Sequence, residues 1–174
     1  MENDTERNEV GRRTFLGYVT VALGGFIGVL IGIPSIGSAV LPALRARRSA
    51  PLTSAGPPAQ FPIGRPTAAT VTVVQRDGWV ESRDDRGVWV VRRGESQFTV
   101  YNGRCTHLGC AYNWNQTAQE FQCPCHGGRY NLDGVVLGGP PPRPLDTLEW
   151  RVEQGALQVA FQDFRLGIPQ KEAA

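Results

Sequence analysis

The residues of this chain that could bind a metal are confined to two short segments. One reads C-T-H-L-G-C over residues 105–110, and the other reads C-P-C-H-G-G over residues 123–128. These segments contain all four cysteines and both histidines of the 174 residues. Thiolate sulfur and imidazole nitrogen are ligands that proteins use for zinc and for iron–sulfur centres. The clustering therefore predicts a metal centre built from two loops.

Three kinds of structure compete to explain this spacing. Structural zinc sites usually combine a C-x-x-C pair with a second such pair or with spaced histidines. Here the close pairs are instead Cys105-x-His107 and Cys123-x-x-His126. Two plain disulfides in an exported domain would leave both histidines without a role. A 2Fe–2S centre with two cysteines on one iron and two histidines on the other uses both residue types.

The two motifs resemble the signature of the Rieske subunit of cytochrome bc-type quinol:cytochrome c oxidoreductase complexes. The resemblance extends over an N-terminal anchor, a linker and an outer domain in the same order. It implies one 2Fe–2S Rieske cluster as the cofactor. By this resemblance, Cys105 and Cys123 bind one iron, and His107 and His126 bind the other.

The same resemblance assigns the remaining cysteines and the substrate contact. It implies a disulfide between Cys110 and Cys125 that joins the two loops, and such a bond requires an oxidising compartment. It also implies that His126 contacts the quinol, because the family uses the second-loop histidine for this contact.

The ligand set favours quinol oxidation on electrostatic grounds. Two ferric ions, two sulfides and two thiolates sum to zero charge, so one electron would reduce a neutral centre. Four thiolates would make the oxidised centre negative, and this charge opposes reduction. Rieske potentials accordingly lie at about −150 to +300 mV, against about −400 mV for plant-type ferredoxins.

Two residues after the second motif are expected to tune the cluster. Tyr130 stands where the family places a tyrosine that hydrogen-bonds a ligand cysteine. Gly128 stands where high-potential members carry a serine that donates to a bridging sulfide. Since donors to sulfur stabilise the reduced state, glycine predicts a lower potential and favours menaquinol as the donor.

A glycine- and proline-rich stretch follows, and residues 138–144 read GGPPPRP. It resembles the proline loop that covers the cluster in the family. Proline fixes its own backbone and has no N–H to donate, so the loop is expected to be stiff. The resemblance assigns the cover to Gly139, Pro140, Pro141 and Pro142.

The elements that carry these loops begin with an apolar N-terminal segment. Residues 14–44 contain no charged side chain, and a spanning helix needs roughly 20 residues. We expect a transmembrane anchor over residues 15–44, with Pro34 ending or kinking the helix because it lacks an N–H. Residues 1–14 form the predicted cytoplasmic N-terminus, in which the run R-R-T-F-L resembles a twin-arginine export signal.

Basic residues flank the apolar segment on both sides, so the positive-inside rule does not decide its orientation. The export signal and the expected disulfide both favour an outer location for the C-terminal domain. The sequence therefore predicts a single-pass protein of the bacterial cytoplasmic membrane, with this domain on the periplasmic or extracellular face.

Residues 45–69 are rich in Pro, Ala, Ser and Gly and are predicted to form a flexible tether. The tether would let the outer domain move between the quinol and its acceptor. Residues 70–174 are predicted to be an all-β Rieske domain, a small antiparallel sandwich or barrel with cluster-binding loops. Turn signals at residues 94–96, 133–134 and 154–155 predict three hairpins.

The net charge of +2 gives no reason to expect a nucleic-acid partner. The resemblance implies electron transfer from membrane quinol to a cytochrome c-type acceptor. Cytochrome b and a cytochrome c-type subunit would be partners, in a dimeric complex within the lipid bilayer. The small Rieske subunit of arsenite oxidase is the alternative. A Rieske ferredoxin is disfavoured, because it would need neither the anchor nor the second cysteine pair.

Overall fold

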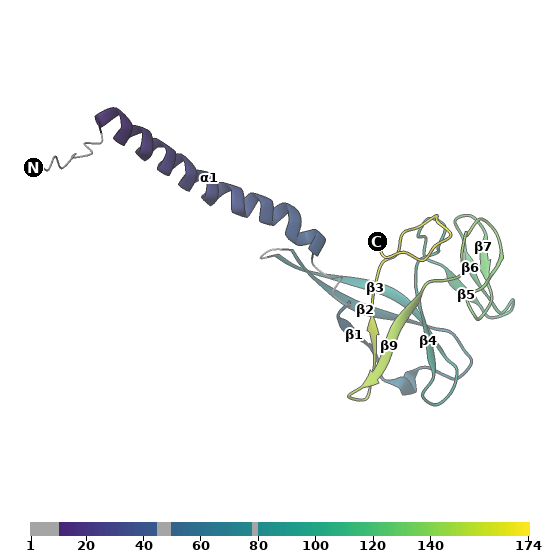
Figure 1. Cartoon of the computed structure of the whole chain (residues 1–174). Helices are drawn as coiled ribbons and strands as arrows, with labels where there is room; N and C mark the ends of the chain where they lie inside the picture. The colour runs from purple at the N-terminus through teal and green to yellow at the C-terminus, as the bar shows by residue number, and fades with distance from the viewer. Residues whose placement is uncertain (1–10, 45–49, 78–79) are drawn as a thin grey trace, which may run out of the picture. The chain divides into compact units, whose positions relative to one another are not determined.

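The structure is a computed structural model that describes residues 11–44, 50–77 and 80–174. The chain divides into two compact units, Met1–Arg48 and Ser49–Ala174. The described part of the first unit is one helix, α1 (Arg12–Leu44), and the second unit is built mainly from strands (Figure 1). Most of the predicted cytoplasmic N-terminus, residues 1–10, lies outside the described residues.

Helix α1 is long and apolar enough to cross a membrane. Within its stretch Arg12–Leu41, an 18-residue window has a mean hydropathy of 2.1 and no burial within the protein. At a rise of 1.5 Å per residue, the 33 residues of α1 span about 50 Å, which exceeds the roughly 30 Å of a bilayer core. The length and composition agree with the predicted anchor.

Of the two effects expected of Pro34, an end of the helix is wrong, since α1 continues to Leu44, and a kink stays a prediction. Proline removes only one backbone N–H, and side-chain hydroxyls can satisfy carbonyls near such a break. The Ser35 hydroxyl donates to the carbonyl of Ile31 at 2.7 Å, and the Ser38 hydroxyl donates to that of Ser35 at 2.8 Å.

The second unit is built around a six-stranded antiparallel sheet in the order β1-β10-β9-β4-β3-β2. The two strands at the ends of this order, β1 and β2, are also in contact, so the sheet is a nearly closed barrel. Its strands are β1 (Leu52–Gly56), β2 (Thr67–Asp77), β3 (Val80–Arg92), β4 (Phe98–Asn102), β9 (Thr147–Glu153) and β10 (Ala156–Ala160). A short 3-10 helix, η1 (Pro58–Gln60), follows β1.

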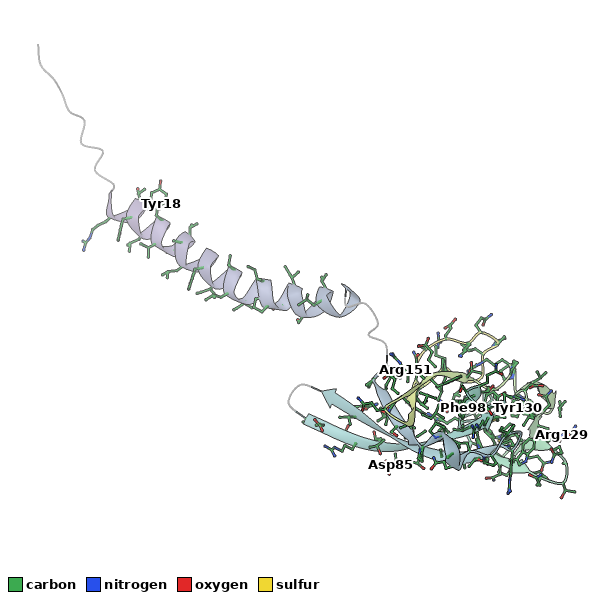
Figure 2. All side chains as sticks on the ribbon, turned by 90° about the horizontal axis from the view of Figure 1, so that it is seen from below. Tyr18, Asp85, Phe98, Arg129, Tyr130 and Arg151 are labelled. Atoms are coloured by element: carbon green, nitrogen blue, oxygen red, sulfur yellow. A yellow bond between two sulfur atoms is a disulfide. The ribbon has the colours of Figure 1, made fainter. Side chains whose placement is uncertain are left out.

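Side chains on alternate positions of these strands fill the barrel, as expected where one side of a sheet is buried. Phe98, labelled in Figure 2, belongs to this core. The buried members are Ala55, Phe61, Val71, Val73, Val88, Val90, Phe98, Val100, Leu148, Leu157, Val159 and Phe161.

A smaller four-stranded sheet carries the second cysteine motif. Its order is β5-β6-β7-β8, and it lies at one end of the barrel (Figure 1). The strands are β5 (Asn113–Asn115), β6 (Glu120–Cys123), β7 (Gly128–Tyr130) and β8 (Val136–Gly138). A second core beneath it includes Cys105, Cys123 and Tyr130 together with Tyr101, Tyr112 and Phe121.

The three predicted hairpins are present. β3 pairs with β4, β7 with β8, and β9 with β10, all antiparallel. Gly134 and Gly155 take φ values of +75° in two of the turns, a conformation that glycine adopts without steric cost.

The predicted extent of the tether is wrong, because its C-terminal part is folded. Within residues 45–69, Leu52–Gly56 forms β1 and pairs with β10. Phe61 is only 1% exposed and packs edge-on against Phe98 at 6.4 Å between ring centroids. The composition of this stretch is that of a linker, but main-chain pairing and one aromatic anchor order it. Residues 45–49 lie outside the described residues.

Candidate metal centre

The two cysteine motifs form two loops with the same local design. The Gly109 N–H donates to the carbonyl of Cys105 at 2.9 Å, and the Gly127 N–H donates to that of Cys123 at 3.2 Å. In each loop the glycine lies four residues after the cysteine and takes a positive φ, +79° and +69°. Each motif is therefore a tight turn that carries one free cysteine and one histidine.

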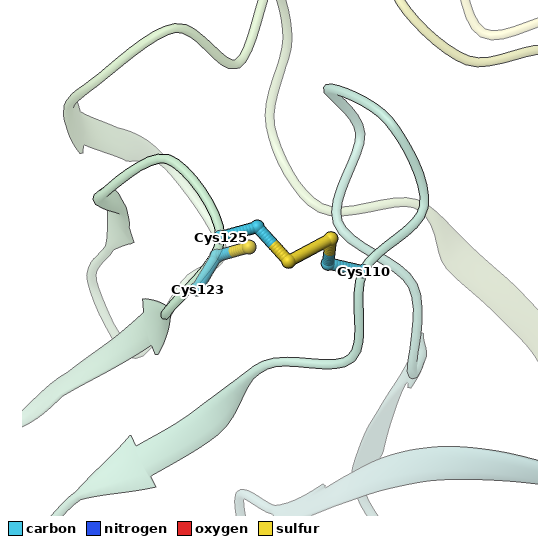
Figure 3. A group of neighbouring side chains, drawn as sticks. All are labelled: Cys110, Cys123 and Cys125. Carbon is cyan, nitrogen blue, oxygen red and sulfur yellow. A yellow bond between two sulfur atoms is a disulfide. The ribbon is translucent and has the colours of Figure 1, made fainter.

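A disulfide joins the loops, as the family resemblance implied. The Sγ atoms of Cys110 and Cys125 are 2.08 Å apart (Figure 3). The Cys123 sulfur lies with them, all three within 4.8 Å of one another. This trio is not a metal site, because a metal ligand must be a free thiolate. The free cysteines are Cys105 and Cys123, which are 2% and 3% exposed.

The two histidines lie next to each other. The ring centroids of His107 and His126 are 4.9 Å apart and the rings are nearly perpendicular, at 88°. His126 is exposed and His107 is half-buried. The Cys105 side chain also contacts that of Cys123, so the structure pairs two buried thiols and, separately, two imidazoles that are nearer to solvent.

This donor set fits a Rieske cluster, since it offers two free thiols and two adjacent imidazoles in separate turns. When bound, the cluster supplies reversible one-electron transfer. Burial raises the pKa of the Cys123 thiol, and the Cys105 side chain raises it further. Binding of the metal at Cys123 therefore has to release a proton.

Tyr130 lies against the first cysteine, as expected for the tuning tyrosine. Its hydroxyl is 3.1 Å from Cys105 Sγ and 3.1 Å from Thr106 Oγ1. Burial, followed by the hydrogen bond with Cys105, raises the pKa of Tyr130 well above its usual value. The phenol therefore stays protonated, and it can donate to a thiolate, which only accepts. Thr106 is a further member of this site that sequence reasoning missed.

The proline loop packs on the second motif. An ideal Cβ on Gly128 would lie 2.8 Å from Pro141 Cγ, and one on Gly139 would lie 2.6 Å from the Gly127 carbonyl oxygen. Pro141 is buried, Pro142 is half-buried and Pro140 is exposed. The two glycines therefore allow the loop to approach the cysteine turn within van der Waals contact.

Comparison with known proteins agrees with this geometry. Residues 57–149 match the Rieske [2Fe-2S] domain. The menaquinol:cytochrome c reductase iron-sulfur subunit of Bacillus subtilis is 32% identical over 155 residues, which cover 87% of this chain and 92% of that protein. The cytochrome b6-f complex iron-sulfur subunit of Chlorobaculum tepidum is 32% identical over 150 residues, covering 86% of this chain and 75% of that protein.

Among solved structures, the plasma membrane Rieske protein of Synechocystis PCC 6803 is 34% identical, with a TM-score of 0.37 over 51% of this chain and 84% of that one. The assignment rests on the sequence matches and on the two ligand turns. This chain belongs to the Rieske 2Fe–2S family.

Proposed function

We propose that this chain is the Rieske subunit of a cytochrome bc-type complex and carries electrons from membrane quinol to a cytochrome c-type acceptor. The cluster is held by Cys105, His107, Cys123 and His126. The observation that carries the proposal is a pair of linked turns, each with one buried free cysteine and one histidine, whose two imidazoles lie in contact. Relatives that match most of this chain are named as iron–sulfur subunits of such complexes, which supports cytochrome b and a cytochrome c-type subunit as partners in a dimeric assembly.

His126 is the residue that meets the quinol in this proposal. Its imidazole is exposed, so a quinol hydroxyl can approach the ring nitrogen that does not bind iron. When that nitrogen has lost its own proton, it would accept a hydrogen bond from the quinol hydroxyl and take up the proton that the quinol releases as it gives up an electron.

Menaquinol is the quinol that we propose. Gly128 has no side-chain hydroxyl to donate to a cluster sulfide, which favours a lower potential and hence a more strongly reducing donor. The same residue lies in contact distance of Pro141, so a larger side chain would have to displace the proline loop. The Bacillus subtilis relative is named for menaquinol.

We place the second unit on the outer face of a bacterial cytoplasmic membrane, with α1 as a single-pass anchor. The disulfide between Cys110 and Cys125 supports an oxidising compartment for that unit. The run Arg12-Arg13-Thr14-Phe15-Leu16 at the start of α1 supports export of the folded domain through the twin-arginine route.

The test is a redox titration of the full-length protein, purified in detergent and followed by electron paramagnetic resonance. A Rieske-type signal with a midpoint in the low or middle part of the family range is expected. Absence of any reducible signal would contradict the assignment of a Rieske cluster. A midpoint at the high end of the family range would contradict menaquinol as the electron donor. Co-purification with cytochrome b, rather than with a molybdenum protein, separates this function from that of an arsenite oxidase subunit.

A further inference from the structure

The segment after β10 contains no named strand, but it is tied to the first ligand turn. We call residues 162–174 the C-terminal loop. It folds back on itself, since the Ala174 N–H donates to the Asp163 carbonyl at 3.0 Å. Midway along it, the Gly167 N–H donates to the carbonyl of Thr106 at 3.0 Å. Thr106 lies between Cys105 and His107, so the loop contacts the main chain at the ligands themselves.

A buried arginine holds this loop in place. Arg143 Nη1 donates to the carbonyl of Ile168 at 2.6 Å, and Nη2 donates to that of Arg165 at 2.8 Å. Its Nε and Nη2 also donate to the two carboxylate oxygens of Asp146, at 3.0 and 2.7 Å. The guanidinium therefore holds two carbonyls that flank Gly167, together with one carboxylate.

The main chain of Arg143 also contacts the side chain of Thr106. The Thr106 hydroxyl donates to the main-chain carbonyl of Arg143 at 2.8 Å. The side chain of Thr106 is thus fixed by Arg143 directly, and its carbonyl is fixed through the C-terminal loop. Thr106 is 0% exposed, and its Oγ1 is 3.1 Å from the Tyr130 hydroxyl that contacts Cys105.

A contribution to stability alone does not account well for this arrangement. Arg143 and Asp146 are the buried charged residues in the described part of the chain, at 5% and 3% exposed. Removing two charges from water costs about as much as their attraction returns, and apolar residues of similar size often stabilise a fold as well or better. The planar guanidinium does offer what an apolar side chain cannot, which is several directed N–H donors at fixed angles.

We propose that Arg143 is a positioning residue for the cluster. Its guanidinium holds the C-terminal loop, whose Gly167 N–H fixes the Thr106 carbonyl, and it orders the backbone of residue 143, whose carbonyl accepts from the Thr106 hydroxyl. In this way it sets the hydrogen bond between Tyr130 and Cys105 and the position of His107. This inference rests on the proposed function, because it requires the cluster to bind at those ligands.

The test uses full-length protein with its cluster, in detergent. The double variant Arg143→Met with Asp146→Leu removes both charges together, so neither is left buried without a partner. We expect a lower midpoint potential and an altered resonance line shape. Arg143→Lys, which keeps the charge but not the planar fork, should give an intermediate shift. The control is Arg151→Met, which removes an exposed arginine paired with Glu153 on the surface (Figure 2).

A double-mutant cycle identifies the route of the effect. In a Tyr130→Phe background, the Arg143 and Asp146 substitutions should lower the midpoint little further, because the bond that they position is already absent. Fully additive shifts would overturn the route through Tyr130. An unchanged midpoint and line shape in the folded double variant would overturn the positioning role.

If the double variant does not fold, a variant truncated after Gln162 provides a second measurement of the midpoint potential. It keeps Arg143 and the Gln162 carbonyl that accepts from Asn102, and it removes the donor from Gly167. The same downward shift is expected, and a midpoint equal to that of the complete chain would contradict the proposal. Failure of the proposed function is distinguishable, because the unmodified protein would then show no Rieske signal at all.

Discussion

Tyr130 is the side chain whose removal gives the simplest change at the centre. Tyr130→Phe deletes the hydroxyl 3.1 Å from Cys105 Sγ without changing the shape of the core. A hydrogen bond to a charged group contributes about 1.5–3 kcal/mol, and for one electron about 1.4 kcal/mol corresponds to about 59 mV. If the bond strengthens by about 1.4 kcal/mol on reduction, loss of the bond should lower the midpoint by about 60 mV. A redox titration followed by electron paramagnetic resonance measures this change.

Tyr101→Phe is the matched control for this change. Tyr101 is also buried, at 1% exposed, but its hydroxyl donates to the Leu132 carbonyl at 3.1 Å. Its loss should cost about 1 kcal/mol of folding free energy and leave the midpoint unchanged. Equal midpoint shifts in the two variants would show that the Tyr130 contact does not tune the cluster.

Gly128→Ser tests the argument for menaquinol. The serine hydroxyl should donate to a cluster sulfide and raise the midpoint, but any Cβ here would meet Pro141 Cγ at 2.8 Å. Gly128→Ala introduces the same crowding without a hydroxyl, so the difference between the two variants isolates the hydrogen bond. If the midpoint of Gly128→Ser is no higher than that of Gly128→Ala, the absence of a hydroxyl at this position does not lower the potential.

At the scale of elements, the proline loop depends on Gly139. Alanine at this position would be strained, because φ is +89°, and its Cβ would lie 2.6 Å from the Gly127 carbonyl and 2.8 Å from Gly128 Cα. Backbone atoms cannot move aside as a side-chain end can, so Gly139→Ala should push the loop off the second turn. We expect a lower melting temperature and faster loss of the cluster to a chelator.

Gly155→Ala separates strain from crowding. Gly155 has a φ of +75° in the turn between β9 and β10, and nothing lies within 4 Å of its ideal Cβ. This variant should lose only the roughly 1 kcal/mol that a left-handed alanine costs, with an unchanged rate of cluster release. If both variants release the cluster at the same rate, the close approach at Gly139 does not retain it.

The sequence predicted the elements that carry strong local signals. Asp133-Gly134 and Gln154-Gly155 need positive φ, and each does form the turn of a hairpin. β1 was missed because L-T-S-A-G has little β propensity, and its order comes from pairing with a strand about 100 residues further along the chain. The continuation of α1 past Pro34 was missed for the complementary reason, since a local rule was outweighed by the surrounding helix.

At the candidate metal centre too, features with a local sequence signal were predicted, and features that depend on distant contacts were not. The clustering of cysteines and histidines predicted a metal centre, and the family resemblance supplied the ligand set and the disulfide pairing. Thr106 and Arg143 were missed, since their roles arise from contacts with a C-terminal loop that no pattern marks. An arginine inside a proline-rich loop, three residues before an aspartate, is the one signal that could have drawn attention to them.

For the whole molecule, the length of chain between α1 and β1 limits how far the second unit, Ser49–Ala174, can move from the helix. α1 ends at Leu44 and β1 begins at Leu52, so eight Cα–Cα steps of at most about 3.6 Å allow a separation below about 30 Å. Replacing residues 45–49 with five prolines should slow quinol-dependent turnover of the complex and leave the midpoint unchanged. A glycine–serine replacement of the same length is the control, and equal turnover of both variants would argue against movement at this linker.

The four expected ligands differ in exposure, and this difference limits how an electron donor and an electron acceptor can dock. Cys105 and Cys123 are enclosed in the core, while His126 is exposed and His107 is half-buried, so in the proposed function a partner would approach the cluster most closely from the imidazole side. A donor and an acceptor that both need this side cannot be docked at once. Each must therefore compete with the other, and an excess of either one should inhibit the exchange. On the proposed function, the second unit would work as a carrier that binds its electron donor and its electron acceptor in turn, rather than both at once.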